Sequence, residues 1–521
     1  MQIQRVKNAS RNMLYGTALQ ILKLAVPFAM RTAMLYLLGV EYLGLNSLFT
    51  SVLSVLNLAE LGVGSAMVYS MYEPIAEDNI EKICALMRLY KIYYRMIGCV
   101  ICFLGLILLP FIPKLINGDI PADINIYILY LLNLTVTVFS YWLFAYKSSI
   151  LQAYQRNDII SKASLISESV KYAMQFFALA VFRNYYLYVL VSIVIQVFNN
   201  ILTAAFAERM YPRCRACGTL DKLEQKAINL RIRDLFTAKI GTVVVYSSDT
   251  IVISAFLGLT ALAVYQNYYY LFTAVASLLT IIFTSVRAGL GNSIIVDRKE
   301  KLFSDFKKFL FIIMWLAGFC SACFLCLYQP FMELWVGADL LMDFGVVICM
   351  VVYFFVHCLN TFLNSYKDAS GMWHEDRFRP LVEAGINLFL NLLLVRYIGL
   401  YGIVLSTILS MLAVAPWLIH NLFRVIFDKS CVRPILKRLG YYVFVSAVAV
   451  VISYSICTCI HLPLVYTVLI RLVVCMICTN LVLFAFYFKL PEFRQCLILL
   501  DRMTNGKIGI FHRLRMNDNG E

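Results

Sequence analysis

The chain has 521 residues, of which 61% are hydrophobic and 14% are charged, and its formal net charge is +15. Soluble globular proteins carry roughly 45–50% apolar and about 25% charged residues, so this composition excludes an ordinary water-soluble domain. Long uncharged runs, such as those from Leu439 to Ile460 and from Leu472 to Phe488, favour membrane-spanning helices. Barrel strands would instead alternate apolar and polar residues. We therefore predict an all-α integral membrane protein.

Apolar stretches bounded by charge, glycine or proline predict fourteen membrane spans in chain order. An even number of spans places both termini on one side of the membrane. The first stretch is too long for the core of a typical signal peptide, so we expect it to remain as the first helix. The expected bounds are 13–38, 43–69, 90–113, 124–146, 160–182, 185–207, 234–257, 261–287, 308–329, 342–366, 380–396, 399–423, 439–460 and 465–488.

The basic residues test this assignment, because lysine and arginine gather in cytoplasmic loops. With these spans, 35 of the 45 basic residues lie on the side that holds the termini. The opposite side holds three, Lys114, Arg183 and Arg396. The split predicts cytoplasmic termini, and it explains the positive charge without a nucleic-acid partner.

Two distant matches predict an internal repeat. Leu38–Leu45 resembles Leu257–Val264, and the Tyr146-Lys147 pair recurs as Tyr366-Lys367 at nearly the same offset along the chain. The offset spans six helices, an even number, so both copies point the same way and form a parallel repeat. We expect two six-helix lobes followed by two C-terminal helices. The predicted parts are 1–208 (first lobe), 209–233 (cytoplasmic linker), 234–424 (second lobe), 425–488 (helices 13 and 14) and 489–521 (cytoplasmic tail).

Two basic residues lie inside the first span, where ionisable side chains are costly and usually functional. Lys23 and Arg31 are eight residues apart, about 80° around a helix, so they share a broad face, and Pro27 between them predicts a kink. This span contains no acid of its own. The residues leave two interpretations open: a cationic cavity lined by this helix, or ion pairs with acids on other helices.

Other ionisable residues also fall within spans. Glu60 lies on a predicted polar stripe of span two, and Lys239 and Asp249 lie on span seven, the repeat partner of span one. We expect Glu168 and Lys171, three residues apart, to form an internal ion pair. Glu383, which lies within a turn of Arg379, and Arg471 are near span ends, where long side chains reach the headgroups. The predicted stripe comprises Asn46, Thr50, Asn57, Glu60 and Gly64.

Enzyme and metal chemistry have little support in the sequence. Cys214-x-x-Cys217 lacks a second pair of ligands, and a lone pair cannot complete a four-ligand zinc site. A membrane-embedded polymerase or glycosyltransferase remains an alternative, but such enzymes usually need a sizeable outer loop. The longest outer loop expected here, Pro330–Leu341, is short, and the five histidines form no cluster. We predict no metal, no cofactor and no catalytic residue.

Three N-terminal segments resemble bacterial polysaccharide flippases of the multidrug/oligosaccharidyl-lipid/polysaccharide exporter superfamily: Arg31–Phe49, Asn57–Ala66 and Tyr72–Ala76. The resemblance implies transport of undecaprenyl-diphosphate-linked oligosaccharide from the inner to the outer leaflet, with basic residues of a central cavity engaging the diphosphate. Arg31 lies inside the matching segment and Lys23 just before it, and the repeat adds Lys239.

The resemblance also implies a bacterial cytoplasmic membrane, a lipid-linked oligosaccharide substrate, and glycosyltransferases and a polymerase of the same pathway as partners. Glu60 and Asp249 are candidates for cation coupling or for charge balance, and charge balance is favoured slightly. A drug or cation antiporter of the same superfamily is the alternative. Drug exporters of this superfamily typically carry an acid in the first span, and this chain has none there.

Overall fold

The structure is a computed structural model that describes residues 5–60, 62–118, 120–372, 375–460 and 462–503. Helices joined by short loops make up this part of the chain, and it contains no strand. In order, they are α1 (Arg5–Leu37), α2 (Val40–Leu56), η1 (Asn57–Glu60), α3 (Val63–Ala76), α4 (Ile80–Leu108), η2 (Leu109–Leu115), α5 (Ile126–Trp142), η3 (Ala145–Lys147), α6 (Ser148–Ala153), α7 (Asn157–Phe177), η4 (Ala178–Phe182), α8 (Tyr185–Met210), α9 (Lys222–Val296), α10 (Lys299–Val336), η5 (Ala338–Leu340), α11 (Phe344–Ser370), α12 (Arg379–Ile398), α13 (Leu400–Val425), η6 (Lys429–Cys431), α14 (Val432–Thr458), α15 (Leu464–Tyr487) and α16 (Pro491–Met503).

Within the described residues, twelve helices are long and apolar enough to cross a membrane, or thirteen if the bent pair Ile126–Trp142 and Ala145–Ala153 forms one span. One of the twelve, Lys239–Thr280, has 42 residues and contains Gly258 with non-helical dihedral angles. The two segments that meet at Gly258 are each about 30 Å long at 1.5 Å per residue, the thickness of a bilayer core. Counting them separately, and the bent pair as one span, would give fourteen, so the count of fourteen stays a prediction. The prediction of an all-α membrane protein is confirmed.

The outward faces of these helices carry large apolar side chains. Along α15, for example, Val473, Ile477 and Leu481 are each more than half exposed, and they are four residues apart on one helical face. An apolar surface of this kind needs lipid as its solvent.

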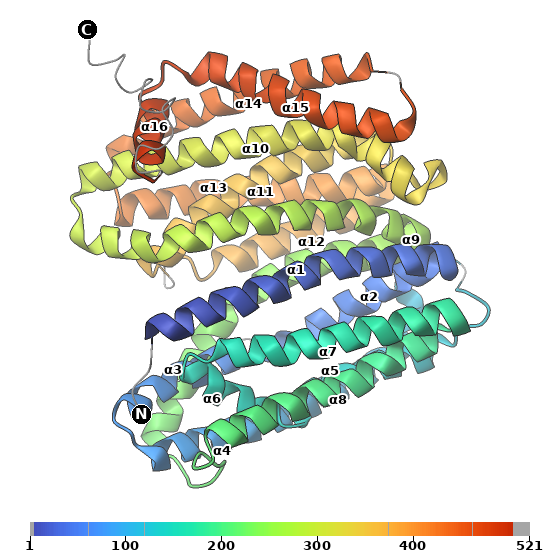
Figure 1. The fold of residues 1–521 in the computed structure, drawn as a ribbon, viewed down its shortest axis with the longest axis vertical. Coiled ribbons are helices and arrows are strands. Elements are labelled where there is room, and N and C mark those ends of the chain that lie inside the picture. The colour runs from blue at the N-terminus through green and yellow to red at the C-terminus, as the bar shows by residue number, and fades with distance from the viewer. Residues whose placement is uncertain (1–4, 61, 119, 373–374, 461, 504–521) are drawn as a thin grey trace. The chain divides into compact units, whose positions relative to one another are not determined.

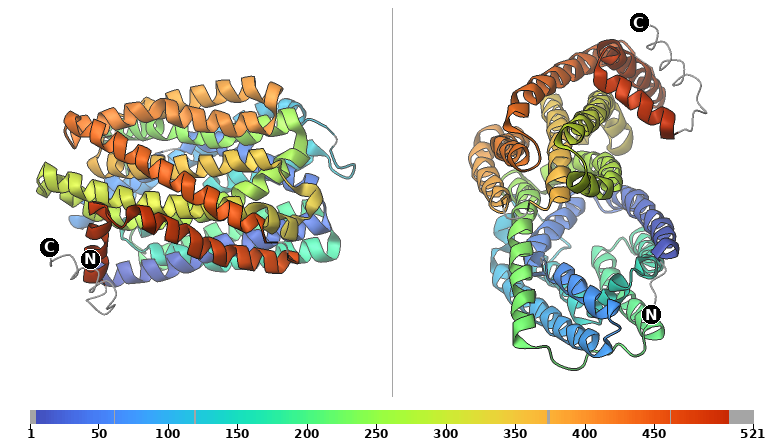
Figure 2. Two further views of the ribbon diagram at one scale, coloured as in Figure 1. Left: turned by 90° about the horizontal axis from the view of Figure 1, so that it is seen from above. Right: turned by 90° about the vertical axis from the view of Figure 1, so that its left-hand side faces the viewer.

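By its internal contacts the chain divides into two compact units, residues 1–266 and 267–521. Unit 1 contains α1 to α8 and the first part of α9, and unit 2 contains the remainder. In each unit the long helices run roughly parallel or antiparallel to one another (Figures 1 and 2). In unit 1, α1 packs along α7, and in unit 2, α10 packs against both α14 and α15. The predicted lobe bounds, 1–208 and 234–424, remain a prediction.

Backbone conformations repeat at the predicted offset. Gly39, between α1 and α2, has φ 126° and ψ 170°, and Gly258, which matches it in the predicted repeat, has φ 90° and ψ 176°. The same offset relates Gly118 to Gly337, whose φ angles are 94° and 91°. These angles are accessible to glycine and strained for other residues, so each glycine has a conformational reason for its position.

The polar contacts at two helix starts repeat as well. The backbone N–H of Asn125, the N-cap residue of α5, donates to the hydroxyl of Tyr186, the second residue of α8 (2.6 Å). In unit 2 the hydroxyl of Tyr401, the second residue of α13, donates to Asp343, the N-cap residue of α11. In each unit the tyrosine at the second position of one helix thus contacts the N-cap residue of another, which supports the parallel repeat.

Candidate functional site

The basic residues of α1 differ in their surroundings. Arg31 is half-buried, and its positive charge acts on the hydroxyl of Tyr188 on α8. The ring of Tyr188 stacks on that of Tyr185 with 5.6 Å between centroids, and the Tyr185 hydroxyl donates to Asn46 on α2 (3.2 Å). Arg31 therefore lies near enough to Tyr188 for its charge to act there, and Tyr188 belongs to an aromatic and polar cluster of α2 and α8. Such a cluster offers hydrogen-bond partners and stacking surfaces to a polar ligand.

Lys23, two turns before Arg31 on α1, is exposed and forms no ion pair with any residue that the structure describes. Lys239, near the start of the seventh expected span, is also exposed, but its charge acts on the carboxylate of Glu60. The structure thus associates Lys239 with the acid of span two. Lys23 and Arg31 share α1, as the sequence predicted.

Span two is interrupted in its middle. The α-helical hydrogen bonding of α2 stops at Leu56, a 3₁₀ turn follows at Asn57–Glu60, and Gly62 has a left-handed conformation (φ 90°, ψ −21°) before α3 begins. The predicted continuous stripe through residues 46, 50, 57, 60 and 64 is therefore broken, because a left-handed glycine ends regular helix at this point. Discontinuous helices of this kind frequently form the binding sites of transporters.

Glu60 is held at this break by hydrogen bonds. Its carboxylate accepts from the backbone N–H of Gly64 in the first turn of α3 and from the hydroxyl of Tyr94 (3.4 Å). The ring of Tyr94 packs against those of Tyr90 and Tyr141, with centroids 4.2 and 5.4 Å away. A negative charge at the start of a helix is favoured by the helix dipole, so Glu60 stabilises the first turn of α3.

Asp249 lies in a polar stretch of α9. It is buried, with 6% of its surface exposed, beside the buried side chains of Ser247, Ser248 and Thr250. The amide of Gln266 donates to the Thr250 hydroxyl (2.8 Å). This cluster belongs to unit 1.

The remaining charged residues of the spans have clear partners. The expected ion pair between Glu168 and Lys171 on α7 is confirmed, and it is about one-quarter exposed. The guanidinium of Arg471 donates to the carbonyl of Ile460, just beyond the end of α14 (3.4 Å). None of these three residues belongs to the cluster of Tyr185, Tyr188 and Asn46 described above.

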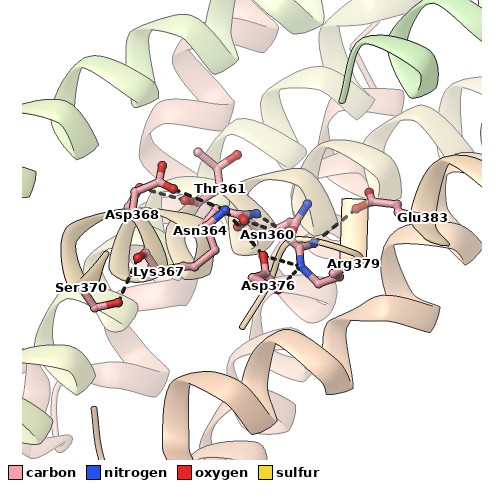
Figure 3. A network of polar contacts seen from close by, with 10 residues as sticks. Asn360, Thr361, Asn364, Lys367, Asp368, Ser370, Asp376, Arg379 and Glu383 are labelled. Atoms are coloured by element: carbon pink, nitrogen blue, oxygen red, sulfur yellow. Dashed lines mark hydrogen bonds and ion pairs between the residues drawn. The ribbon is translucent and has the colours of Figure 1, made fainter. Parts of the chain in front are cut away.

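A second polar network lies in unit 2, between α11 and α12 (Figure 3). The Nε atom of Arg379 donates to both carboxylate oxygens of Asp376 (2.8 and 3.0 Å), and its Nη1 atom donates to Glu383 (3.3 Å). Its Nη2 atom donates to the side-chain oxygen of Asn364 (2.8 Å), and Lys367 lies 3.5 Å from Asp376. The expectation that Glu383 reaches the headgroups is wrong. Its side chain is buried, and its carboxylate accepts a hydrogen bond from Arg379.

The charges of this network argue against an anion site. The cations Lys367 and Arg379 face three acids, Asp368, Asp376 and Glu383. A phosphate would therefore enter a region where acids already outnumber cations. The spacing of Asp376, Arg379 and Glu383, three and four residues apart, is the spacing of one helical face and could have predicted the network.

Known proteins match this chain in structure rather than in sequence. No family model matches the chain, and no curated protein matches it. Solved structures do match. An inward-facing multidrug resistance MATE family transporter of the MOP superfamily has a TM-score of 0.57 and 14% identity, covering 76% of this chain and 94% of that one. The lipid II flippase MurJ in an inward closed conformation has a TM-score of 0.64 and 16% identity, covering 92% and 99%.

A third match, a MOP superfamily transporter from Pyrococcus furiosus described as having a binding pocket of reversed polarity, has a TM-score of 0.50 and 13% identity, covering 81% and 96%. At such identities the likeness shows the fold alone. The chain has the fold of these MOP superfamily transporters, which is the fold that the resemblance implies. The polysaccharide flippase family within it stays a prediction.

Proposed function

We propose that the chain moves an undecaprenyl-diphosphate-linked oligosaccharide from the inner to the outer leaflet of a bacterial cytoplasmic membrane. The observation that carries the proposal is the position of Arg31, half-buried on α1 with its charge acting on Tyr188 of α8. Arginine presents a planar fork that matches phosphate oxygens, and a cation within a membrane span is a candidate functional residue.

The rest of α1 fits an anionic ligand. Lys23 lies about 12 Å from Arg31 along the helix axis at 1.5 Å per residue, and it forms no ion pair with a described residue. The segment 11–37 of α1 contains no aspartate or glutamate. We assign Arg31 and Lys23 to the diphosphate, with Lys239 as a further cation, while the sugars occupy the cavity and the lipid tail stays in the bilayer.

In this proposal the two six-helix lobes alternate between inward-open and outward-open states, and helices 13 and 14 provide a surface for the lipid tail. Both termini face the cytoplasm, where glycosyltransferases of the pathway assemble the substrate, and a polymerase receives it on the other side. The fold shared with the lipid II flippase MurJ supports a lipid-linked substrate.

A drug or cation antiporter is the second candidate, and two observations favour it. The fold is shared with MATE family multidrug transporters, and Glu60 and Asp249 supply acids within spans of unit 1. The contacts of Glu60 supply another reason for its position, since it stabilises the start of α3 and balances the charge of Lys239. An embedded polymerase gains no support from the structure.

The test is a flipping assay with the purified full chain in vesicles. An undecaprenyl-diphosphate-linked sugar carrying a fluorescent label is added to the membrane, and protection from an external quencher reports its movement. Each lost charge-assisted hydrogen bond contributes about 1.5–3 kcal/mol, which corresponds to roughly 10–100-fold. We expect the double variant Lys23→Ala with Arg31→Ala to flip at least about tenfold more slowly than the native chain.

The matched control is Lys114→Ala, which removes a cation whose Nζ atom lies 5.6 Å from the Phe111 ring. It should flip at the native rate. A native rate in the double variant would refute the diphosphate assignment. Export of dye cations together with no flipping of the labelled lipid would support the antiporter instead, and new glycosidic bonds would support the polymerase.

The variant Glu60→Gln distinguishes the two candidate roles of Glu60, which are coupling of transport to a cation gradient and balance of the positive charge of Lys239. The amide retains an oxygen that can accept from Gly64, so we expect transport to keep its response to a proton or sodium gradient. Loss of that response in a folded variant would assign Glu60 to coupling.

A further inference from the structure

Three cysteine thiols from three helices of unit 2 meet inside the protein. Cys326 lies on α10, Cys457 on α14 and Cys475 on α15, and their sulfur atoms all lie within 4.8 Å of one another. Each of these residues is at most 1% exposed. The three helices pack directly against each other, so the cluster forms where they converge.

The spacing of the sulfurs suits a metal ion. The Sγ atoms of Cys457 and Cys475 are 3.7 Å apart. Two thiolates bound to one tetrahedral zinc ion at about 2.3 Å each are separated by about 3.8 Å. Cys323, one turn before Cys326 on α10, packs against the cluster.

A buried cation lies beside the sulfurs. Arg471 precedes Cys475 by one turn of α15, and the Cys457 thiol donates to its backbone carbonyl (3.9 Å). Its Nη2 atom donates to Ile460, while its Nε atom is buried and has no hydrogen-bond partner among the described residues. A neighbouring arginine favours thiolate over thiol, and the thiolate is the form that binds metals.

The sum of the charges favours a divalent ion. Three thiolates, one divalent cation and the Arg471 guanidinium together carry no net charge. A neutral assembly can be buried within a membrane protein, whereas a site with a remaining charge is costly there. With a monovalent ion the same three thiolates and Arg471 would leave one negative charge.

Two simpler explanations account for less. Buried cysteines often pack as small apolar side chains, and Leu327, Tyr454 and Val474 do surround this cluster. Apolar packing does not explain why three sulfurs face one another beside a buried guanidinium. A disulfide between two of them would leave the third without a role, and the cysteines of the structure are free.

We propose that Cys326, Cys457 and Cys475 bind one thiophilic divalent cation of the zinc type. Because the three sulfurs are buried and come from three helices, the ion is structural. It fastens the C-terminal helix pair α14–α15 to α10. The site is independent of the substrate that the chain transports.

The first test measures metal content and zinc binding of the purified full chain by elemental mass spectrometry. We expect one zinc ion per chain, and we expect the variant Cys457→Ala with Cys475→Ala to bind none. The matched control is Cys358→Ala, which removes an equally buried cysteine of α11 and should keep the zinc. Arg471→Gln should bind zinc about 10–100-fold more weakly, the usual effect of losing a group that supports metal ligands.

A second measurement needs no variant and therefore does not depend on how well variants fold. Zinc added to the native chain should protect Cys326, Cys457 and Cys475 from alkylation after partial unfolding, while the exposed Cys99 is alkylated equally with and without zinc. The proposal is overturned if zinc does not bind, or if the double variant binds it as the native chain does. Binding of Cu⁺ without Zn²⁺, or a Cys457–Cys475 disulfide in chain isolated from membranes, would also overturn it.

Discussion

Replacing Arg379 by alanine should destabilise unit 2 more than any loss of an exposed charge. The side chains of Arg379, Asp376 and Glu383 are only 4, 3 and 10% exposed. Arg379 makes two hydrogen bonds to Asp376, one to Glu383 and one to Asn364. The substitution removes these four bonds together and leaves two acids in a region of low dielectric constant.

The expected loss follows from the charges that stay behind. Removing one partner of a buried ion pair costs about 3–5 kcal/mol, because the other partner is left without compensation. Asp376 keeps one cation, since Lys367 remains 3.5 Å away, but Glu383 loses the only basic partner with which it forms a described ion pair. We therefore expect the lower end of the range, about 3 kcal/mol, which is roughly a hundredfold in the unfolding equilibrium.

The assay is equilibrium unfolding in mixed detergent and dodecyl sulfate micelles, followed by circular dichroism. Lys171→Ala is the matched control: its pair with Glu168 is about one-quarter exposed, so the loss should be at most about 1 kcal/mol. Adding Glu383→Gln to Arg379→Ala should restore part of the stability, because it removes the carboxylate that lost its partner. Equal losses for Arg379→Ala and Lys171→Ala, or no recovery in the double variant, would refute the reasoning.

Two further predictions concern backbone strain and thiol reactivity. Gly62→Ala should cost about 2 kcal/mol or more of folding free energy, because its φ is 90° and an added Cβ would lie 2.6 Å from that of Leu235. Gly16→Ala, where an added Cβ meets no atom within 4 Å, should leave stability unchanged or raise it by up to about 1 kcal/mol in the same unfolding assay. Equal stabilities of these two variants would contradict the first expectation. Burial raises the pKa of the Cys214 thiol to about 11, so its alkylation should continue to accelerate up to about pH 11. At pH 7, peptide mass spectrometry should find Cys214 alkylated more slowly than the exposed Cys217, and equal rates would show that Cys214 is accessible.

The spans could be predicted from the sequence because lipid requires long uninterrupted apolar runs, and the alternation of charges then orders them. The same signal misses local breaks. Phe144 has a left-handed conformation (φ 60°) where α5 ends and the chain bends by 46°, although neither glycine nor proline marks the place. Hydropathy alone cannot reveal this bend, since Phe144 is as apolar as its neighbours.

The surroundings of individual charges were harder to predict, because they depend on which helices pack together. Lys23 and Arg31 could be identified from α1 alone, and the Glu168–Lys171 pair from its spacing. The charge of Lys239 acts on Glu60, which comes from a different element far earlier in the chain, so no local pattern contains both residues. The three thiols of Cys326, Cys457 and Cys475 likewise come from three helices, and they meet only after α10, α14 and α15 have packed.

The very short connections between successive helices restrict how they can move. Two residues separate α1 from α2, and the single residue Gly399 separates α12 from α13. A residue of extended chain reaches at most about 3.6 Å, so neither helix of such a pair can slide far along its own axis without pulling the other. Piston-like displacement is thus suppressed, whereas tilting about the shared junction is not. During a transport cycle, the two helices of each hairpin should accordingly shift along their axes together.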